Sequence, residues 1–168
     1  MHAPGDVRVE DRPDPQIVDP TDAVIRLAAT CICGSDLWPY RGADAPDHSP
    51  MGHEYVGVVT EIGNAVANVK VGDFVVGSFF TSDNTCEICR AGYQSHCVNR
   101  TPIGREGTQA EFARIPNADG TLVATPGQPD ADQCRQRVAR PRGDHRPRDR
   151  GQPHQHFGHA QRTAIDRQ

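Results

Sequence analysis

Short apolar runs separated by polar turns organise the first two thirds of this chain. Residues 23–30, 54–62 and 74–80 are runs of strand length, and 109–115 is another short run, which Pro116 ends. Runs of this kind, rich in β-branched residues and bounded by Gly, Pro, Asn or Asp, predict β-strands. A short helical turn is expected at 37–40. Several short strands with regular turn signals indicate a mainly β, barrel-like domain.

This pattern changes twice along the chain. Residues 81–105 are polar, irregular and rich in cysteine, so we expect a lobe or a long loop there. After about Asp132 the strand pattern stops, and residues 133–168 contain nine Arg, six Gln and four His but only three large apolar side chains. Such a segment buries too little apolar surface to offset the entropy of ordering it. We therefore predict a domain at 1–132 and a disordered tail at 133–168.

The charge of the chain changes sign at the same boundary. Residues 1–132 carry nine Lys/Arg against 19 Asp/Glu, whereas 133–168 carry nine Arg against three Asp. Such a break favours two regions of different origin. We favour an out-of-frame translation of a GC-rich gene for the Arg-rich segment. The alternative is a basic arm that binds nucleic acid through phosphates, but the segment lacks interleaved aromatics, so nucleic acid is the less favoured partner.

The compartment bears on how the cysteines are interpreted. The longest apolar runs are far shorter than the ~20 residues of a membrane helix, and residues 1–15 contain no apolar stretch of signal-peptide type. We therefore expect a cytoplasmic location and no membrane partner. In a reducing compartment, the six cysteines are metal ligands more often than they are disulfides.

The strongest local signal is the spacing Asp83-x2-Cys86-x2-Cys89-x7-Cys97. Three thiols this close together can surround one tetrahedral zinc, which takes four ligands in a structural site and favours thiolates. Asp83 repeats the three-residue step and is a reasonable fourth donor through oxygen. The alternatives are unligated thiols and a redox Cys-x-x-Cys pair. The redox pair is disfavoured because that motif normally opens a helix after a strand.

A second signal joins Cys33, which begins Cys-Gly-Ser-Asp, to His53 and Glu54 in Gly-His-Glu. Cys and His both bind zinc, and a catalytic zinc needs only three protein donors and an open position. Taken alone, these residues favour ordinary structural roles. A lone histidine is more often a surface or core side chain, and a lone cysteine is more often a small buried apolar residue.

Five stretches of the chain occur in one order: Cys33–Asp36, Gly52–Gly57, Val71–Val75, Cys86–Cys97 and Ala110–Phe112. This order resembles the medium-chain dehydrogenase superfamily, in its zinc-dependent alcohol dehydrogenase branch. The resemblance covers roughly residues 1–132 and implies a GroES-like barrel with a zinc-binding lobe. The family interconverts small alcohols and aldehydes or ketones with NAD(P), uses two zinc ions and forms homo-oligomers.

The resemblance implies a role for each residue of the second signal. Cys33 and His53 would bind a catalytic zinc, and Glu54 would lie beside the metal and be able to approach it. Ser35 would be the hydroxyl that accepts the substrate proton and begins a relay to solvent. Asp36 would hold the ring of His53 in the right tautomer. Zinc would act as a Lewis acid on the substrate oxygen, and the nicotinamide would exchange the hydride.

The resemblance also implies a structural zinc in the cysteine segment, with two departures from the family pattern. Asp83 would join Cys86, Cys89 and Cys97 at the position where relatives more often have a fourth cysteine. Trp38 stands where many relatives have a relay histidine, so the proton must leave by another path or through water. Trp38 itself either lines a substrate pocket or packs as a core aromatic.

The Rossmann domain that binds the cofactor in this family is absent from these residues, because no GxGxxG fingerprint occurs among them. We therefore expect this chain to be inactive by itself. The rival functions are a non-enzymatic zinc-binding module, a nucleic-acid binder that acts through 133–168, and a zinc-free quinone reductase of the same superfamily. The cysteine and histidine motifs disfavour the quinone reductase.

Overall fold

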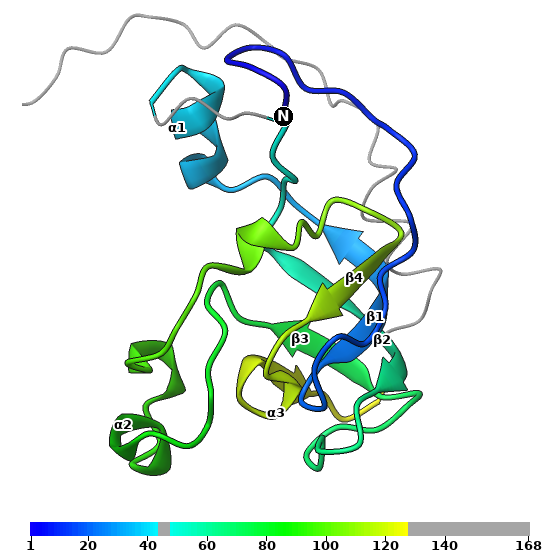
Figure 1. Cartoon of the computed structure of the whole chain (residues 1–168), viewed down its shortest axis with the longest axis vertical. Helices are drawn as coiled ribbons and strands as arrows, with labels where there is room; N and C mark the ends of the chain where they lie inside the picture. Colours follow the sequence, from blue (N-terminus) through cyan, green and yellow to red (C-terminus); the bar gives the residue numbers. More distant parts are fainter. Residues whose placement is uncertain (44–47, 128–168) are drawn as a thin grey trace, which may run out of the picture. The chain divides into compact units, whose positions relative to one another are not determined.

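The computed structural model describes residues 1–43 and 48–127 (Figure 1). The predicted disordered tail at 133–168 and the predicted boundary at residue 132 lie outside the described residues. The described residues include every candidate site residue. None of its helices is long and apolar enough to cross a membrane.

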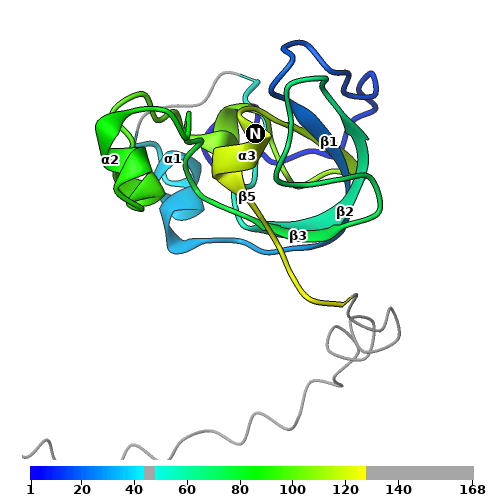
Figure 2. The same cartoon turned by 90° about the horizontal axis from the view of Figure 1, so that it is seen from below.

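A five-stranded antiparallel sheet forms the framework of this region. Its strands stand in the order β4-β1-β2-β3-β5, and each neighbouring pair is antiparallel. Seen from below, β1, β2 and β3 follow one another in a curved layer (Figure 2). The mainly β class predicted from the sequence is confirmed. The strands are β1 (Ala23–Thr30), β2 (Tyr55–Ile62), β3 (Phe74–Gly77), β4 (Phe112–Ile115) and β5 (Leu122–Ala124).

The strand bounds follow the predicted runs, but two strands are shorter. β1 spans the predicted residues, and β2 begins one residue later than predicted. β3 ends at Gly77 instead of residue 80, and the ring of Tyr55 lies so close to Gly77 that a side chain has no room there. β4 begins at Phe112 instead of residue 109, because the preceding backbone bonds to the loop before β2.

The core is formed by buried apolar side chains from all five strands. In β2, buried positions alternate with partly buried ones, which is the period of two expected for a strand with one covered face. Each buried Val or Ile contributes about 1.5–3 kcal/mol relative to an exposed one. The buried apolar residues of the strands are Ala23, Val24, Ile25, Tyr55, Val59, Phe74, Val75, Ala113, Ile115 and Leu122.

The sequence pattern did not predict β5 or the helical turn α3 (Ala118–Thr121) that precedes it. Asn117 enters this turn in the left-handed region, with φ at 51°. The hydroxyl of the buried Thr121 donates to the carbonyl of Pro116 at 3.0 Å and accepts from the N–H of Ser82 at 3.1 Å. Contacts with a distant segment therefore stabilise a turn that its own residues do not signal.

Helical turns lie at the ends of the strands and in the cysteine-bearing segment. A 3-10 turn, η1 (Gly34–Asp36), and the predicted turn α1 (Leu37–Tyr40) follow β1. Residues 81–105 form the expected lobe, which contains α2 (Glu87–Arg90) at the lower left of Figure 1. The two 3-10 turns of this lobe are η2 (Gln94–His96) and η3 (Ile103–Arg105).

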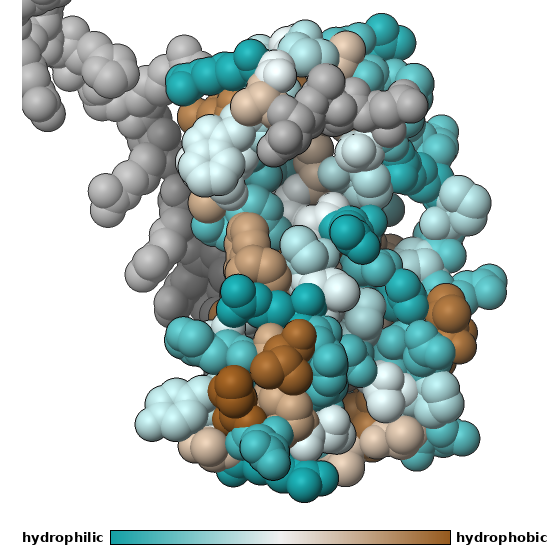
Figure 3. All heavy atoms as spheres, turned by 60° about the vertical axis from the view of Figure 1, so that its left-hand side comes forward, coloured by the Kyte–Doolittle hydropathy of each residue, from teal (hydrophilic) through white to brown (hydrophobic). Residues whose placement is uncertain are grey.

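The tip of the lobe, residues 86–98, buries little apolar surface apart from two thiols. Cys89 and Cys97 are each 2% exposed, whereas Ile88, Tyr93 and Val98 are 37%, 63% and 66% exposed. Figure 3 turns this side of the molecule forward and shows hydrophobic side chains gathered low on its surface. An apolar core of its own therefore does not hold this part of the lobe together.

A buried ionic network ties the start of β1 to β4. The carboxylate of Asp22, which is fully buried, accepts a hydrogen bond from Arg114 at 2.9 Å. The other guanidinium nitrogens of Arg114 donate to both oxygens of Glu106, at 2.9 and 3.2 Å. Asp22 also accepts the N–H groups of Val18 and Asp19. The network fixes the 106–111 segment, which in turn bonds the loop that leads into β2.

Candidate metal-binding sites

Cys33, His53 and Glu54 converge at one end of the β1–β2 pair. Their potential ligand atoms all lie within 4.8 Å of one another. The register of the sheet explains this convergence: Thr30 pairs with Tyr55, so the residues that follow β1 and those that precede β2 leave the sheet side by side. The two segments predicted to share a site are therefore brought together.

His53 is held on both sides of its ring. The ring is buried, its Nδ1 lies 3.3 Å from Oδ1 of Asp36, and its Nε2 lies 3.2 Å from the hydroxyl of Ser35. Asp36 also accepts the N–H of Cys33 at 2.8 Å through its other oxygen. When Nδ1 donates to Asp36, Nε2 carries the lone pair, which can accept from the hydroxyl of Ser35 or bind a metal.

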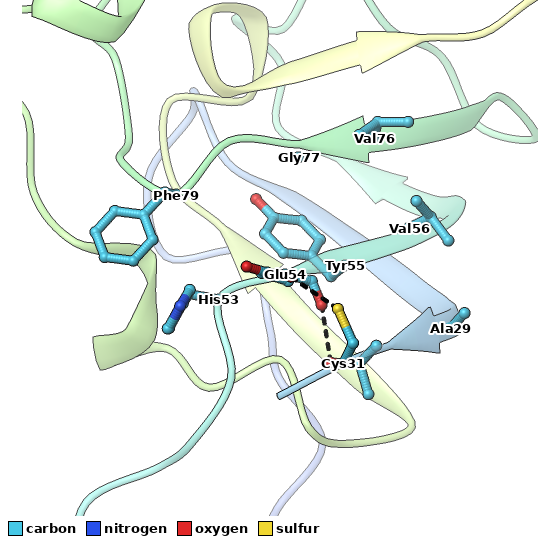
Figure 4. Close-up of a pocket in the computed structure, with 10 residues that line it drawn as sticks. Ala29, Cys31, His53, Glu54, Tyr55, Val56, Val76, Gly77 and Phe79 are labelled. Atoms are coloured by element: carbon cyan, nitrogen blue, oxygen red, sulfur yellow. Dashed lines mark hydrogen bonds between the residues drawn. The ribbon is translucent and has the colours of Figure 1, made fainter. Parts of the chain in front are cut away.

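Glu54 accepts hydrogen bonds from two neighbouring thiols. The Sγ of Cys31 lies 2.8 Å from Oε2 of Glu54, and Figure 4 shows the two side chains pointing toward each other. The hydrogen bond from Cys31, followed by one from Cys33, lowers the pKa of Glu54 below its usual value. Cys31 was missed in the sequence analysis. The available signal was the Cys-x-Cys spacing, because alternate residues of an extended stretch share a face.

A cavity of ≈ 400 Å³ opens beside these residues (Figure 4). Phe79 and His53 both line it, and their rings meet edge to face with centroids 4.4 Å apart. Trp38 is 65% exposed and does not line this cavity, so it is not a core aromatic. The lining residues are Ala29, Thr30, Cys31, His53, Glu54, Tyr55, Val56, Val76, Gly77 and Phe79.

The lobe brings together a second group of potential ligands, Asp83, Cys86, Cys89 and Cys97. Their ligand atoms also lie within 4.8 Å of one another. All three thiols are free, and the Sγ atoms of Cys86 and Cys89 are 3.4 Å apart. N–H groups of Val98 and Cys89 lower the pKa of the Cys86 thiol, which favours the thiolate that a metal requires.

Both carboxylate oxygens of Asp83 are engaged by donors of the lobe. Oδ1 accepts the N–H groups of Thr85 and Cys86 at 2.9 and 3.2 Å, and Oδ2 accepts the amide of Asn99 at 2.6 Å. These bonds, the one from Thr85 first, hold the pKa of Asp83 far below its ordinary range. Asp83 is thus an ionised oxygen donor beside three thiols, and its outer lone pairs remain suited to a cation.

Two supporting residues of the lobe were not predicted from the sequence. Asn99 holds Asp83, and the buried Ser82 places its hydroxyl 3.1 Å from the Sγ of Cys89. Neither residue lies at a ligand spacing, so no pattern in the sequence marks it. Their contacts exist because the lobe folds back on itself.

Residues 19–127 match the family model described as the alcohol dehydrogenase GroES-like domain. This match covers more than half of the chain and includes all the candidate ligands, so the chain belongs to the GroES-like domain family of alcohol dehydrogenases. The predicted GroES-like fold and the predicted resemblance to zinc-dependent medium-chain dehydrogenases are confirmed.

Individual relatives agree with this assignment. The chain is 43% identical over 130 residues to zinc-type alcohol dehydrogenase B of Aspergillus flavus, and this match covers 75% of this chain and 30% of that protein. It is 40% identical over 131 residues to the medium chain reductase/dehydrogenase ucsI of an Acremonium species, covering 75% and 45%. Among solved structures, alcohol dehydrogenase TADH of Thermus sp. ATN1 matches with a TM-score of 0.69 and 32% identity, covering 76% and 39%.

The chain therefore spans between 30% and 45% of the length of these relatives. The matched part of each relative is the part that corresponds to the GroES-like unit. What the whole relatives do is a property of proteins of which this chain matches less than half.

Proposed function

We propose that the GroES-like unit of this chain is the zinc-binding catalytic domain of an NAD(P)-dependent alcohol dehydrogenase that interconverts a small alcohol and its aldehyde or ketone. The observation that supports this proposal is the convergence of Cys33, His53 and Glu54 within 4.8 Å. A chance cluster would not require Asp36 to contact both His53 and the backbone of Cys33 as well.

The donor set of this group fits zinc. Cys33, His53 and Glu54 offer a thiolate, an imidazole and a carboxylate, which leaves a position open for substrate at a tetrahedral ion. When bound, zinc would polarise the substrate oxygen, and NAD(P) would carry the hydride. The buried position of His53 beside Phe79 excludes water from one side of the group.

The remaining polar residues of the site receive supporting roles in this proposal. Asp36 keeps the proton of His53 on Nδ1, so that Nε2 faces the metal position. Ser35 is the proposed proton acceptor, because its hydroxyl lies 3.2 Å from Nε2 of His53, next to the proposed ligand group. Since Trp38 carries no titratable group, the proton would continue from Ser35 to water.

For the lobe, we propose a structural zinc held by Asp83, Cys86, Cys89 and Cys97. Four donors close a tetrahedral site, as expected for a structural zinc. The exposed apolar residues of the lobe support the same conclusion, because a metal would replace the core that its tip lacks.

The other components of an alcohol dehydrogenase belong to this proposal as well. NAD(P) would bind to a Rossmann domain, as the family resemblance implies. We place residues 1–132 in the catalytic domain and 133–168 in a separate Arg-rich segment. The proposed partner is a small alcohol or carbonyl compound in the cytoplasm, and we expect neither membrane nor nucleic acid as a partner.

Native mass spectrometry of the purified chain tests the two metal sites together. We expect two zinc ions per chain, and one ion in each of the variants Cys33→Ser and Cys89→Ser. A wild-type chain without stoichiometric zinc, or a Cys33→Ser variant that retains both ions, would contradict the proposal. Zinc in both sites of a full-length relative of this chain, without NAD(P)-dependent turnover, would favour the non-enzymatic zinc-binding module instead.

A further inference from the structure

Cys31 lies beside the proposed catalytic group but has no part in the function proposed above. It follows the last residue of β1 and is exposed, yet its Sγ lies only 2.8 Å from Oε2 of Glu54. At this distance the S–H donates a charge-assisted hydrogen bond to the carboxylate, a stronger contact than one between neutral groups. The side chain of Glu54 therefore has a specific partner outside the ligand group.

The backbone fixes both residues of this pair. The N–H of Cys31 donates to the carbonyl of Glu54 at 3.3 Å, and the hydroxyl of Thr30 donates to the same carbonyl at 2.9 Å. The main chain and the side chain of Glu54 are thus both held by the end of β1. This double contact favours those rotamers of Glu54 that keep its carboxylate near Cys33 and His53.

Metal binding would make this contact more important. Glu54 also accepts a hydrogen bond from the thiol of Cys33. A metal ligand must be a thiolate, which cannot donate and which repels a carboxylate. When Cys33 is deprotonated, the side-chain donor to Glu54 that remains among the described residues is the thiol of Cys31.

We propose that Cys31 is a positioning residue, whose thiol holds the Glu54 carboxylate at the metal position and thereby strengthens metal binding by Cys33, His53 and Glu54. This inference rests on the proposed function, because it takes these three residues as ligands. Outer partners of metal ligands change metal affinity by about 10–100-fold when they are removed. An effect of this size is measurable in the protein without substrate or cofactor.

Titration of the zinc-free full chain with Co²⁺, followed by visible absorption, measures the effect. Cys33→Ser supplies the baseline without this site, so that the signal of the lobe can be subtracted. We expect Cys31→Ala to raise the Kd of the Cys33 site about tenfold or more. Cys31→Ser keeps a hydroxyl donor and should stay within about threefold of the wild type. Ile32→Ala, which changes an adjacent side chain that is 68% exposed, is the matched control and should leave the Kd unchanged.

A double variant shows whether Cys31 acts through Glu54. In a Glu54→Ala background, Cys31→Ala should cause no further loss, because contacting residues that act together are not additive. An unchanged Kd in Cys31→Ala, or an equal loss in the Glu54→Ala background, would overturn the positioning role. So would an equal loss in Cys31→Ala and Cys31→Ser with a weaker thiolate-to-Co²⁺ charge-transfer band, since Cys31 would then be a ligand.

The failure of the proposed function has a different signature in the same titration. If Cys33→Ser binds as much Co²⁺ as the wild type, the catalytic metal site does not exist, and the role of Cys31 is overturned with it. If Cys33→Ser loses one ion while Cys31→Ala binds normally, only the role of Cys31 is overturned.

Discussion

The two candidate metal groups of this molecule are built in opposite ways. The lobe group, from Asp83 to Cys97, comes from one short stretch and is supported by N–H groups of the same stretch. The Cys33 group joins two segments twenty positions apart, which meet because β1 pairs with β2. A loop can thus carry the donors of a metal site within its own sequence, whereas a site at the end of a sheet is only as well formed as the sheet.

The largest effect is expected from the substitution Cys97→Ser in the lobe. Metal binding in small zinc domains is worth about 10–16 kcal/mol, and the lobe has little apolar burial to replace it. We expect the lobe to lose its zinc and to become sensitive to proteases within residues 81–105, while the Cys33 group keeps its metal. Zinc content and limited proteolysis measure both outcomes.

The exposed residue Ser95 supplies the control for this experiment. Ser95→Ala should retain the zinc of the lobe and its resistance to proteolysis. Loss of metal from both groups in Cys97→Ser would show that the lobe and the sheet do not form independent sites.

Arg114→Ala tests how far the Cys33 group depends on the stability of the sheet. The variant leaves the buried carboxylate of Asp22 without its cation, which costs about 3–5 kcal/mol at a fully buried pair. Because the side chain of Arg114 is 22% exposed, we expect a smaller loss, about 2–3 kcal/mol. Urea denaturation measures this loss, and metal titration should show a weaker Cys33 group beside an intact lobe.

An exposed ion pair provides the control for Arg114. Arg8 and Asp6 are 2.7 Å apart, with side chains that are 60% and 36% exposed. Arg8→Ala should change the free energy of unfolding by less than about 1 kcal/mol. A similar loss in both variants would mean that the buried network does not stabilise the sheet.

Gly52→Ala tests the loop that delivers His53. Gly52 has φ at +98°, and an added Cβ would lie 2.7 Å from the backbone nitrogen of Gln109. We expect a loss of about 1–3 kcal/mol and a weaker Cys33 group, with the lobe unaffected. Gly72, with φ at +94° and nothing within 4 Å of an added Cβ, is the matched control. Equal losses in the two variants would show that φ alone, and not the contact with Gln109, accounts for the effect.

The smallest effect is expected from Asn99→Ala, which tests how the carboxylate of Asp83 is held in the lobe. The amide of Asn99 holds one oxygen of Asp83 at 2.6 Å. Its removal should weaken zinc binding by the lobe about tenfold, measured by competition with a chelator. Asp83→Ala in the same assay sets the loss for the whole carboxylate. An Asn99→Ala variant with wild-type affinity would mean that the two backbone N–H groups suffice to place Asp83.

Much of the fold followed from the sequence because its signals are local. The runs at β1 and β2 alternate or bury their side chains with the period of a strand, and their predicted bounds differ from the observed ones by at most one residue. The early end of β3 at Gly77 was not predicted, and the close approach of Gly77 to the ring of Tyr55 on β2 is a tertiary contact that no local pattern signals. β5 was not predicted because three residues are too few to show the period of a strand, and its pairing with β3 joins segments far apart in the sequence.

The Cys33 group was predicted only through the family resemblance, since its residues taken alone favour ordinary structural roles. The sequence pattern alone predicted the mainly β class and the spacing of the proposed lobe ligands, because strand periodicity and ligand spacing are local features of the chain. It also placed the lobe ligands together, since they lie within one loop. Three contacts of the Cys33 group depend on the folded sheet: Cys33 lies near His53, Asp36 contacts the imidazole, and the thiol of Cys31 reaches Glu54. The physical reason is that strand register joins segments whose separation along the chain carries no information about their separation in space.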